Sequence, residues 1–219
     1  MTVQTESYYE AIQHLPPAST LVLTDVLWEE YEELIAAVGE ARGLRISYDS
    51  GRLQIMTLSS AHESYQFLIS NLVNLLSVRL RIKVLCFGSA TMKKQPKGVE
   101  PDLMFYVQTA AALGNRIDID FSLDPPPDIV VEVDLQHQSI AKFPIYAAFG
   151  VPEIWRYDGR LMTIYYLERG EYAPTESSRA LPLLSSGTLT EFLARSHTED
   201  QYQTLLAFEE WLRVRQDRF

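Results

Sequence analysis

The chain has 219 residues, 47% hydrophobic and 22% charged, which is ordinary for a globular protein with a sizeable core. Its formal net charge of −10 argues against nonspecific attraction to nucleic acid or to an anionic membrane. No apolar run reaches the ~18 residues of a membrane span, and no signal-peptide pattern opens the chain. The single cysteine, Cys86, excludes an internal disulfide framework. We therefore expect one domain over residues 1–219, in a reducing cytoplasm.

Sequence periodicity and capping signals predict the elements. Thr24 can cap a helix, and Asp49-Ser50-Gly51 is typical of a hairpin turn. Ser60 with Glu63, and Thr188 with Glu191, have capping-box spacing and predict helix starts. In chain order we expect an irregular lead-in (1–23), a helix (25–38), a hairpin (44–57), a long helix (60–80), strands (83–88, 101–107 and 128–135), a helix ending at 149, a strand (153–158), a second hairpin and two C-terminal helices (within 186–217).

The central order is helix, strand, strand, strand, helix, strand. This mixed order predicts an α/β fold of the α+β type rather than the strict alternation of a dinucleotide-binding sheet. The chain has no glycine-rich phosphate loop, serine nucleophile elbow or paired-histidine zinc motif. We expect structural or surface roles for its four scattered histidines, His14, His62, His137 and His197.

Three acids stand out by position. Asp102 follows Pro101 at the start of an apolar strand, Glu132 lies in the middle of the next strand, and Glu63 begins the long helix. Two carboxylates that share a partly desolvated site raise each other's pKa. A divalent cation removes that penalty, and oxygen donors suit Mg²⁺ or Mn²⁺. The backbone carbonyl of Val133 could be a further ligand.

Each acid also has a structural interpretation, which the sequence leaves open. Glu63 could be only a capping-box residue, and Asp102 only a turn residue at a strand entrance. Glu132 could form a structural ion pair with Lys142, since a mid-strand acid between valines needs a cation or a strong donor. Asp128 is on the Glu132 face but too far along the strand to share one ion, so we expect it to be a decoy.

Lys142 begins the helix after the Glu132 strand and could reach back toward the acids. There it could orient a water molecule or stabilise negative charge on a phosphate. The alternative is an exposed first-turn lysine, which the helix dipole mildly disfavours. Tyr146 follows one turn later on the same helix face. Asp134 is on the strand face of Glu132 and could be an extra ligand or an added repulsion.

Taken together, these residues resemble the Uma family, which is assigned to the PD-(D/E)XK nuclease superfamily and described as restriction endonucleases. The similarity covers roughly residues 24–195. It is carried by Pro101-Asp102, Glu132-Val133, Lys142, Tyr146, "SSAHE" (59–63) and "GVPEIW" (150–155).

The resemblance implies a restriction-endonuclease-like core, which is a mixed sheet flanked by helices, with an added N-terminal helix and hairpin and added C-terminal helices. It implies Mg²⁺, with Mn²⁺ as a substitute, held by Asp102, Glu132 and the Val133 carbonyl. Glu63 would be an accessory acid, and Lys142 the superfamily lysine moved to the helix. The expected reaction is attack of an activated water on a DNA phosphodiester.

The sequence departs from the family pattern just after Glu132. Asp134 stands where the usual superfamily lysine belongs. Residues 135–138, Leu-Gln-His-Gln, replace the family's usual turn and acid in a shorter loop, and Pro144 disturbs the first helical turn. An interaction module that keeps the fold without hydrolysis is therefore the second hypothesis. A metal-independent hydrolase that uses the carboxylates as acid and base is the third.

Two further segments indicate partners. We expect the segment 79–98, which contains no acid, to contact DNA phosphates. Its basic residues are Arg79, Arg81, Lys83, Lys93, Lys94 and Lys97. The last predicted helix, 199–217, is apolar enough to form a homodimer contact or, equally, to pack on its own domain. Its apolar residues are Leu205, Leu206, Phe208, Trp211 and Leu212.

Overall fold

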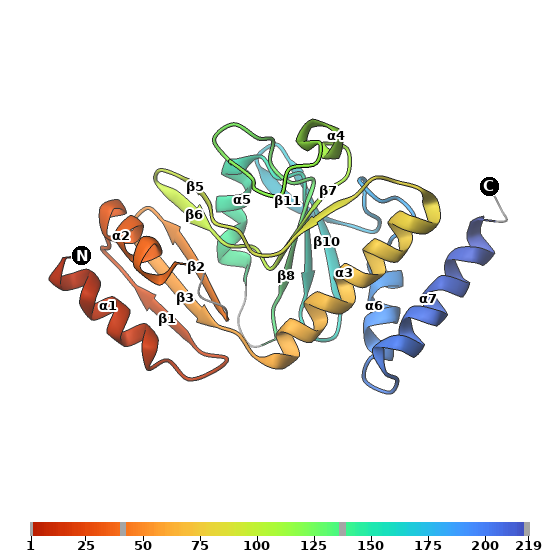
Figure 1. Ribbon diagram of the computed structural model, residues 1–219, viewed down its shortest axis with the longest axis horizontal. Helices are drawn as coiled ribbons and strands as arrows, with labels where there is room; N and C mark the ends of the chain where they lie inside the picture. Colours follow the sequence, from red (N-terminus) through yellow and green to blue (C-terminus); the bar gives the residue numbers. More distant parts are fainter. Residues whose placement is uncertain (1, 40–42, 136–138, 217–219) are drawn as a thin grey trace.

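The computed structural model describes residues 2–39, 43–135 and 139–216, and it contains two β-sheets (Figure 1). The N-terminal sheet has five strands in the order β1-β3-β2-β6-β5. The central sheet has six strands in the order β11-β10-β9-β8-β7-β4, in which the described β8–β9 pair is parallel and the other pairs are antiparallel. It is therefore a mixed sheet, as predicted.

The bounds of the elements are as follows. The N-terminal sheet contains β1 (Thr20–Leu23), β2 (Leu44–Asp49), β3 (Arg52–Thr57), β5 (Met92–Lys94) and β6 (Lys97–Val99). The central sheet contains β4 (Leu85–Phe87), β7 (Leu103–Tyr106), β8 (Ile129–Val133), β9 (Glu153–Tyr157), β10 (Met162–Glu168) and β11 (Glu171–Thr175). The helices are α1 (Val3–Gln13), α2 (Trp28–Val38), α3 (Ser60–Leu80), α4 (Ala110–Leu113), α5 (Phe143–Phe149), α6 (Ser186–Arg195) and α7 (Gln201–Gln216), with a 3₁₀ turn η1 (Ser139–Lys142).

The predicted order of the central elements is confirmed. Helix α3, strands β4, β7 and β8, helix α5 and strand β9 follow one another as helix, strand, strand, strand, helix, strand. Two elements that were not predicted interrupt this series: the short helix α4 between β7 and β8, and the hairpin β5–β6, which joins the N-terminal sheet. Its two strands are three residues each and carry lysines and a glycine, so they lack the alternation of apolar residues that identifies a strand.

The two faces of the central sheet pack against different helices. Ile129, Val131 and Val133 of β8 belong to the core shared with α3, α6 and α7, whereas Val130 belongs to the core under α5. Figure 1 shows α5 on one side of this sheet and α3, α6 and α7 on the other. Because side chains alternate along a strand, Glu132 lies on the Val130 face, toward α5. The predicted division of this strand into two faces is confirmed.

The described part of the predicted irregular lead-in (1–23), residues 2–23, is not irregular, which corrects the prediction. They form α1 and β1, and the Thr2 hydroxyl caps α1 by accepting the Thr5 N–H at 3.2 Å. The Thr5 hydroxyl donates to Glu33 of α2 at 3.0 Å, which fixes the two helices together. This helix depends on a tertiary contact, which local periodicity cannot reveal.

Helix α2 also begins later than predicted, at Trp28. Asp25 adopts a left-handed conformation with φ of 59°, so the residues near Thr24 are not helical. The start is set instead by Glu30, whose carboxylate accepts the Leu27 N–H at 2.9 Å.

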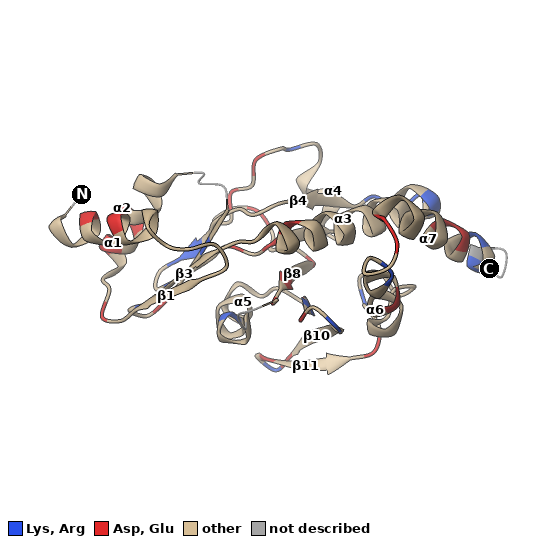
Figure 2. Ribbon diagram, turned by 90° about the horizontal axis from the view of Figure 1, so that it is seen from below, with Lys and Arg blue, Asp and Glu red and all other residues tan. Residues whose placement is uncertain are grey.

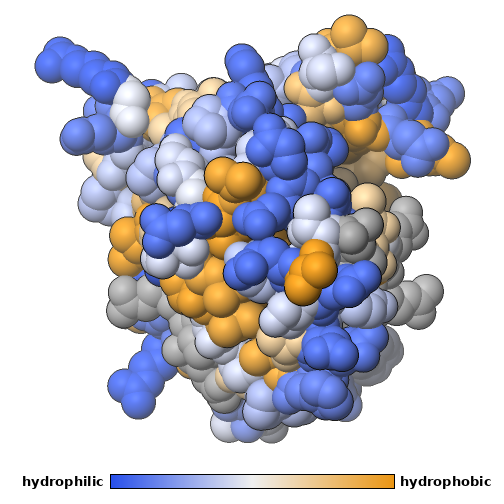
Figure 3. Space-filling view, turned by 90° about the vertical axis from the view of Figure 1, so that its left-hand side faces the viewer, coloured by the Kyte–Doolittle hydropathy of each residue, from blue (hydrophilic) through white to orange (hydrophobic). Residues whose placement is uncertain are grey.

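Acidic residues of α1 and α2 lie together at the N-terminal end of the molecule (Figure 2). Viewed from this end, the surface is mostly hydrophilic with an apolar area between the polar side chains (Figure 3).

The two C-terminal helices pack on the domain itself. Helix α6 is capped by Ser185, which accepts the Thr188 N–H at 3.0 Å, so Thr188 is not the capping residue, although the start at Ser186 agrees with the predicted range 186–217. Helix α7 packs against α3, and Phe208 and Leu212 are fully buried there. Of the two alternatives left open for this apolar face, a dimer contact or packing on its own domain, the second accounts for most of it.

The basic segment 79–98 does not form one surface. Arg79 and Arg81 lie at the C-terminal end of α3, whereas Lys93, Lys94 and Lys97 lie on the β5–β6 hairpin at the other side of the molecule (Figure 1). Several of these cations are also paired within the protein: Arg79 with Glu209, Lys93 with Glu32, and Lys97 with Asp49 at 2.6 Å. The segment is contiguous in the sequence, but its first residues lie at the end of α3 and its last residues lie in the β5–β6 hairpin, which are far apart in the structure (Figure 1).

Within the described ranges, no helix is both long and apolar enough to cross a membrane.

The packing of α7 gives a first prediction. Replacing Phe208, which is 0% exposed, by alanine should lower the free energy of unfolding by about 3–5 kcal/mol, because it removes a ring from a filled core. Tyr202→Ala is the matched control, since Tyr202 lies on the same helix and is 65% exposed. Urea unfolding measures both changes, and equal losses for the two variants would contradict this account of α7.

Candidate active site

Residues 100–102 carry the chain from the N-terminal sheet into the central sheet, because β6 ends just before them and β7 begins just after. Glu100 fastens this crossing to β2. Its carboxylate accepts the Ile46 N–H at 2.9 Å, and its own N–H donates to the Ile46 carbonyl at 3.1 Å. Asp102 therefore lies where the two sheets meet, beside Arg45 of β2.

Both carboxylate oxygens of the buried Asp102 have donors. Arg45 Nε donates to Oδ1 at 3.0 Å, and the Val133 N–H donates to Oδ2 at 2.8 Å. His62 Nε2 lies 3.0 Å from Oδ2. Burial alone would raise the pKa of Asp102, but His62, Lys142 and Arg45 outweigh it and leave the pKa below its ordinary value. Asp102 is thus held as a carboxylate by β2, α3 and β8 at once.

Glu132 is the second buried acid, and it faces a cation from the following helix. Lys142 Nζ donates to Oε2 at 2.7 Å, and the Tyr146 hydroxyl donates to Oε1. Burial raises the pKa of Glu132 to about 7, although Lys142 acts in the opposite direction. Burial would lower the pKa of Lys142, but Glu132 and Asp102 hold it above its ordinary value, so the ammonium stays charged. The ion pair that the sequence left open is present.

Asp134 is paired within the protein as well, although its negative charge still contributes to the raised pKa of Glu132, which is the added repulsion considered above. Its Oδ2 accepts the N–H of Ser139 at 2.8 Å and the Ser139 hydroxyl at 3.0 Å. Arg156 of β9 pairs with the same oxygen. Residues 136–138, to which the expected departures from the family pattern extend, lie outside the described residues. Asp134 is therefore engaged by three protein donors.

Glu63 and Asp128 are not part of this group of contacts. Glu63 is exposed, and its described contacts include none with Asp102 or Glu132. Helix α3 is capped one residue earlier than predicted, by Ser59, which accepts the His62 N–H at 3.2 Å and so aims His62 rather than Glu63 at the site. Asp128 accepts the backbone N–H groups of residues 107 and 109 at 2.6 and 3.0 Å, a structural role that agrees with its expected status as a decoy.

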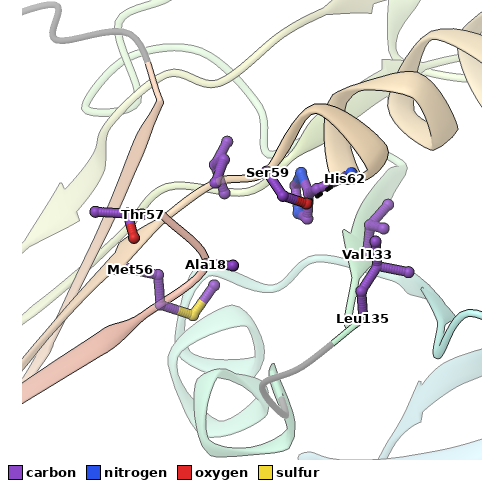
Figure 4. Close-up of a pocket in the computed structure, with 8 residues that line it drawn as sticks. Ala18, Met56, Thr57, Ser59, His62, Val133 and Leu135 are labelled. Carbon is purple, nitrogen blue, oxygen red and sulfur yellow. Dashed lines mark hydrogen bonds between the residues drawn. The ribbon is translucent and has the colours of Figure 1, made fainter. Parts of the chain in front are cut away.

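A small cavity of about 20 Å³ lies against the His62 side of the site, which is room for about one water molecule (Figure 4). Figure 4 shows β3, the start of α3 and the end of β8 around it. His62 is buried, and neither Nδ1 nor Nε2 has a well-aligned hydrogen-bond partner among the described residues, so its contact with Asp102 is a close approach of Nε2 to Oδ2. The lining residues are Ala18, Met56, Thr57, Leu58, Ser59, His62, Val133 and Leu135.

The donor chemistry of Asp102 and Glu132 fits a magnesium ion. Both are carboxylates at the adjoining strands β7 and β8, and each lies within the other's electrostatic reach. Magnesium is commonly held by one or two carboxylates and completes its shell with water and phosphate oxygens. In the described part of the chain, no group of three or more His, Cys, Asp or Glu side chains is arranged to hold a metal ion. An ion at this site would therefore depend on Asp102 and Glu132 together with backbone or solvent oxygens.

The "GVPEIW" run has a structural explanation. Gly150 ends α5 in the left-handed conformation with φ of 73°. Glu153 is buried and accepts the N–H groups of Arg179 and Ala180 at 2.6 and 2.7 Å. Trp155 is fully buried in the central core and donates to Glu153 at 3.2 Å. These residues connect β9 to the segment before α6, away from Asp102 and Glu132.

Sequence reasoning missed three residues that hold the acids. Arg45 and Arg156 were not considered, and His62 was given a plain structural role. Arg45 and Arg156 each lie in a strand whose other residues are mostly buried. The argument used for Glu132, that a charge within a buried strand needs a partner, applies to them equally and was the available signal.

The comparisons with known proteins now identify the class. Residues 28–216 match the family Uma2, described as "Putative restriction endonuclease", and the chain belongs to this family. Among solved structures it is similar to one described as "a putative nuclease belonging to DUF820" from Anabaena variabilis ATCC 29413, with 16% identity and a TM-score of 0.53. That match covers 77% of this chain and 99% of the other. The comparison with curated proteins gives no match.

The fold is therefore restriction-endonuclease-like, as the sequence resemblance implied, and the nuclease class follows from the family. The structural likeness, at 16% identity, supports the fold and not the details of a site.

The raised pKa of Glu132 gives a second prediction, for the protein in EDTA. An acid with a pKa of 4.5 when unfolded and about 7 when folded binds more protons in the folded state between these values. Stability from this group therefore falls as the pH rises through that window. Glu132→Gln cannot ionise, so wild type should lose on the order of 1–3 kcal/mol relative to the variant between pH 4.5 and pH 7.5. Urea unfolding at several pH values measures the difference, and a pH-independent difference would contradict the assignment.

Proposed function

We propose that this protein is a magnesium-dependent endonuclease that hydrolyses DNA phosphodiester bonds. Membership of the Uma2 family supports the nuclease class. The observation that carries the assignment is the meeting of Asp102, Glu132 and Lys142, all buried, at the point where the two sheets join. Two acids on neighbouring strands with a charged lysine beside them have the composition of a site for metal-assisted phosphoryl chemistry.

The residues would have distinct roles. Mg²⁺, or Mn²⁺ in its place, would be held by Asp102, Glu132 and the Val133 carbonyl and would supply charge neutralisation and an activated water. Lys142 keeps its positive charge despite burial and can stabilise negative charge on a phosphate. Tyr146 donates to Glu132 and fixes the orientation of that carboxylate. Glu63 remains a predicted accessory acid.

We place part of the DNA contact on the β5–β6 hairpin. A surface cavity of about 160 Å³ lies between this hairpin and the end of α5, with Lys94, Lys97 and Phe149 among its lining residues. Lys94 is exposed, and an exposed cation beside an aromatic ring suits a nucleic-acid backbone and base. The other three basic residues of the segment lie away from this hairpin, at and just after the end of α3, so any phosphate that they contact would be a separate one. They are Arg79, Arg81 and Lys83.

One observation favours the second candidate function, an interaction module that keeps the fold without hydrolysis. Each of the three acids already pairs with a cation of the protein, and Asp102, Glu132 and Lys142 are each at most 2% exposed. Calorimetric titration with Mn²⁺ separates the two functions. Binding supports the nuclease, and a folded protein that binds no Mn²⁺ supports the interaction module.

The main prediction concerns catalysis. Wild-type protein should cleave DNA with Mg²⁺ or Mn²⁺ and lose cleavage in EDTA, and Glu132→Gln or Glu132→Ala should lower the rate at least 100-fold because a ligand is lost. Glu153→Gln is the matched control, since Glu153 is an equally buried acid of the same sheet that contacts Arg179 and Ala180 instead. Its activity should stay within a few-fold of wild type.

Two outcomes would count against the proposal. Cleavage that persists in EDTA would favour metal-independent hydrolysis, and equal activity of Glu132→Gln and wild type would remove Glu132 from the mechanism. The same assay on Glu63→Gln tests the accessory role of this exposed acid. A loss of tenfold or more supports that role, and unchanged activity removes Glu63 from the site.

A further inference from the structure

Arg45, which belongs to β2 of the N-terminal sheet, forms an ion pair with Asp102. The donors of Asp102 are unevenly divided between its two oxygens: Oδ2 contacts the Val133 N–H and His62, whereas Oδ1 has Arg45 as its donor. A carboxylate oxygen has about two acceptor sites. Oδ1 is therefore the oxygen with room for a further ligand, and the Arg45 guanidinium lies against it.

These three partners of Asp102 differ in how easily they can move away from it. The Val133 N–H belongs to the backbone of β8, which is paired with β9. His62 sits in the first turn of α3, fixed by the Ser59 cap. Arg45 reaches Asp102 through a flexible side chain, and the other described bond of its guanidinium is to the Leu44 carbonyl at 2.7 Å. Arg45 is thus the partner whose contact can be broken by rotation of its side chain, without a shift of β8 or α3, provided that another cation takes its place at Asp102.

Resting on the proposed function, we infer that Arg45 is a built-in competitor for the divalent cation. Its guanidinium neutralises Asp102 in the ion-free protein and leaves Oδ1 when an ion binds there. Two cations cannot share one buried oxygen without strong repulsion, because the surroundings screen charge poorly. Ion affinity is therefore set by the N-terminal sheet as well as by the acids themselves.

The test is calorimetric titration of Mn²⁺ into wild type and Arg45→Met at pH 8. Methionine keeps an unbranched stem and removes the charge, so the packing of β2 is retained as far as possible. Arg45→Met should bind Mn²⁺ at least tenfold more tightly than wild type. Arg52→Met is the matched control, since Arg52 is an exposed arginine of the neighbouring strand β3 that contacts Gln54, and its affinity should equal that of wild type.

Each outcome is decisive. Tighter binding by Arg45→Met alone supports the inference, even where wild type shows no measurable binding. Equal or weaker binding by Arg45→Met, with wild type still binding Mn²⁺ and cleaving DNA, overturns the inference and leaves the proposed function intact. No Mn²⁺ binding by either protein overturns both. An equal gain in Arg52→Met would show a general charge effect and overturn the inference.

A measurement on the wild-type protein guards against misfolding of the variant. The Nε–H group of Arg45, bonded to buried Asp102, should give a protected signal in ¹⁵N NMR spectra, assigned by its absence in Arg45→Lys. Addition of diamagnetic Mg²⁺ should shift or broaden this signal as the guanidinium leaves. A signal that is unchanged at saturating Mg²⁺ would overturn the inference.

Discussion

The carboxylate of Asp102 is the interaction on which the arrangement of this protein depends. It accepts hydrogen bonds from β2 of the N-terminal sheet and from β8 of the central sheet, and His62 at the start of α3 lies 3.0 Å from it. Its position is fixed because residues 100–102 are the crossing between the sheets, and Glu100 ties that crossing to Ile46. A buried charge with one partner removed typically costs 3–5 kcal/mol, so loosening this carboxylate would loosen both sheets.

The rest of the site follows from the same need to compensate buried charge. Asp102, Glu132 and Asp134 are three acids, and Arg45, Lys142 and Arg156 are the three cations paired with them. The cations come from β2, from η1 and from β9. Because each acid is matched, the site can be buried without an ion. Because the acids are already paired, an ion or phosphate that binds to them must replace one of these cations. The residues that stabilise the buried site are therefore the same residues that would bind the ligand.

Sequence periodicity was enough to predict the central elements and the face of β8 that holds Glu132, because alternation along a strand is a local property. The link from Glu132 to Lys142 was also predictable, since ten residues and one turn separate them. Arg45 was not, because its meeting with Asp102 depends on the register of β2 and β6 in a second sheet. Helix α1 and the late start of α2 were missed for a similar reason, as tertiary contacts override weak local signals.

The central claim is that Asp102 and Glu132 together form an ion site. Crystals grown with Mn²⁺, with diffraction recorded at the manganese absorption edge, test it most directly. The account predicts an anomalous peak bonded to both carboxylates, with Arg45 withdrawn from Oδ1 of Asp102. Crystals saturated with Mn²⁺ in which no peak lies between these acids, and in which Arg45 and Lys142 keep their present partners, would contradict it.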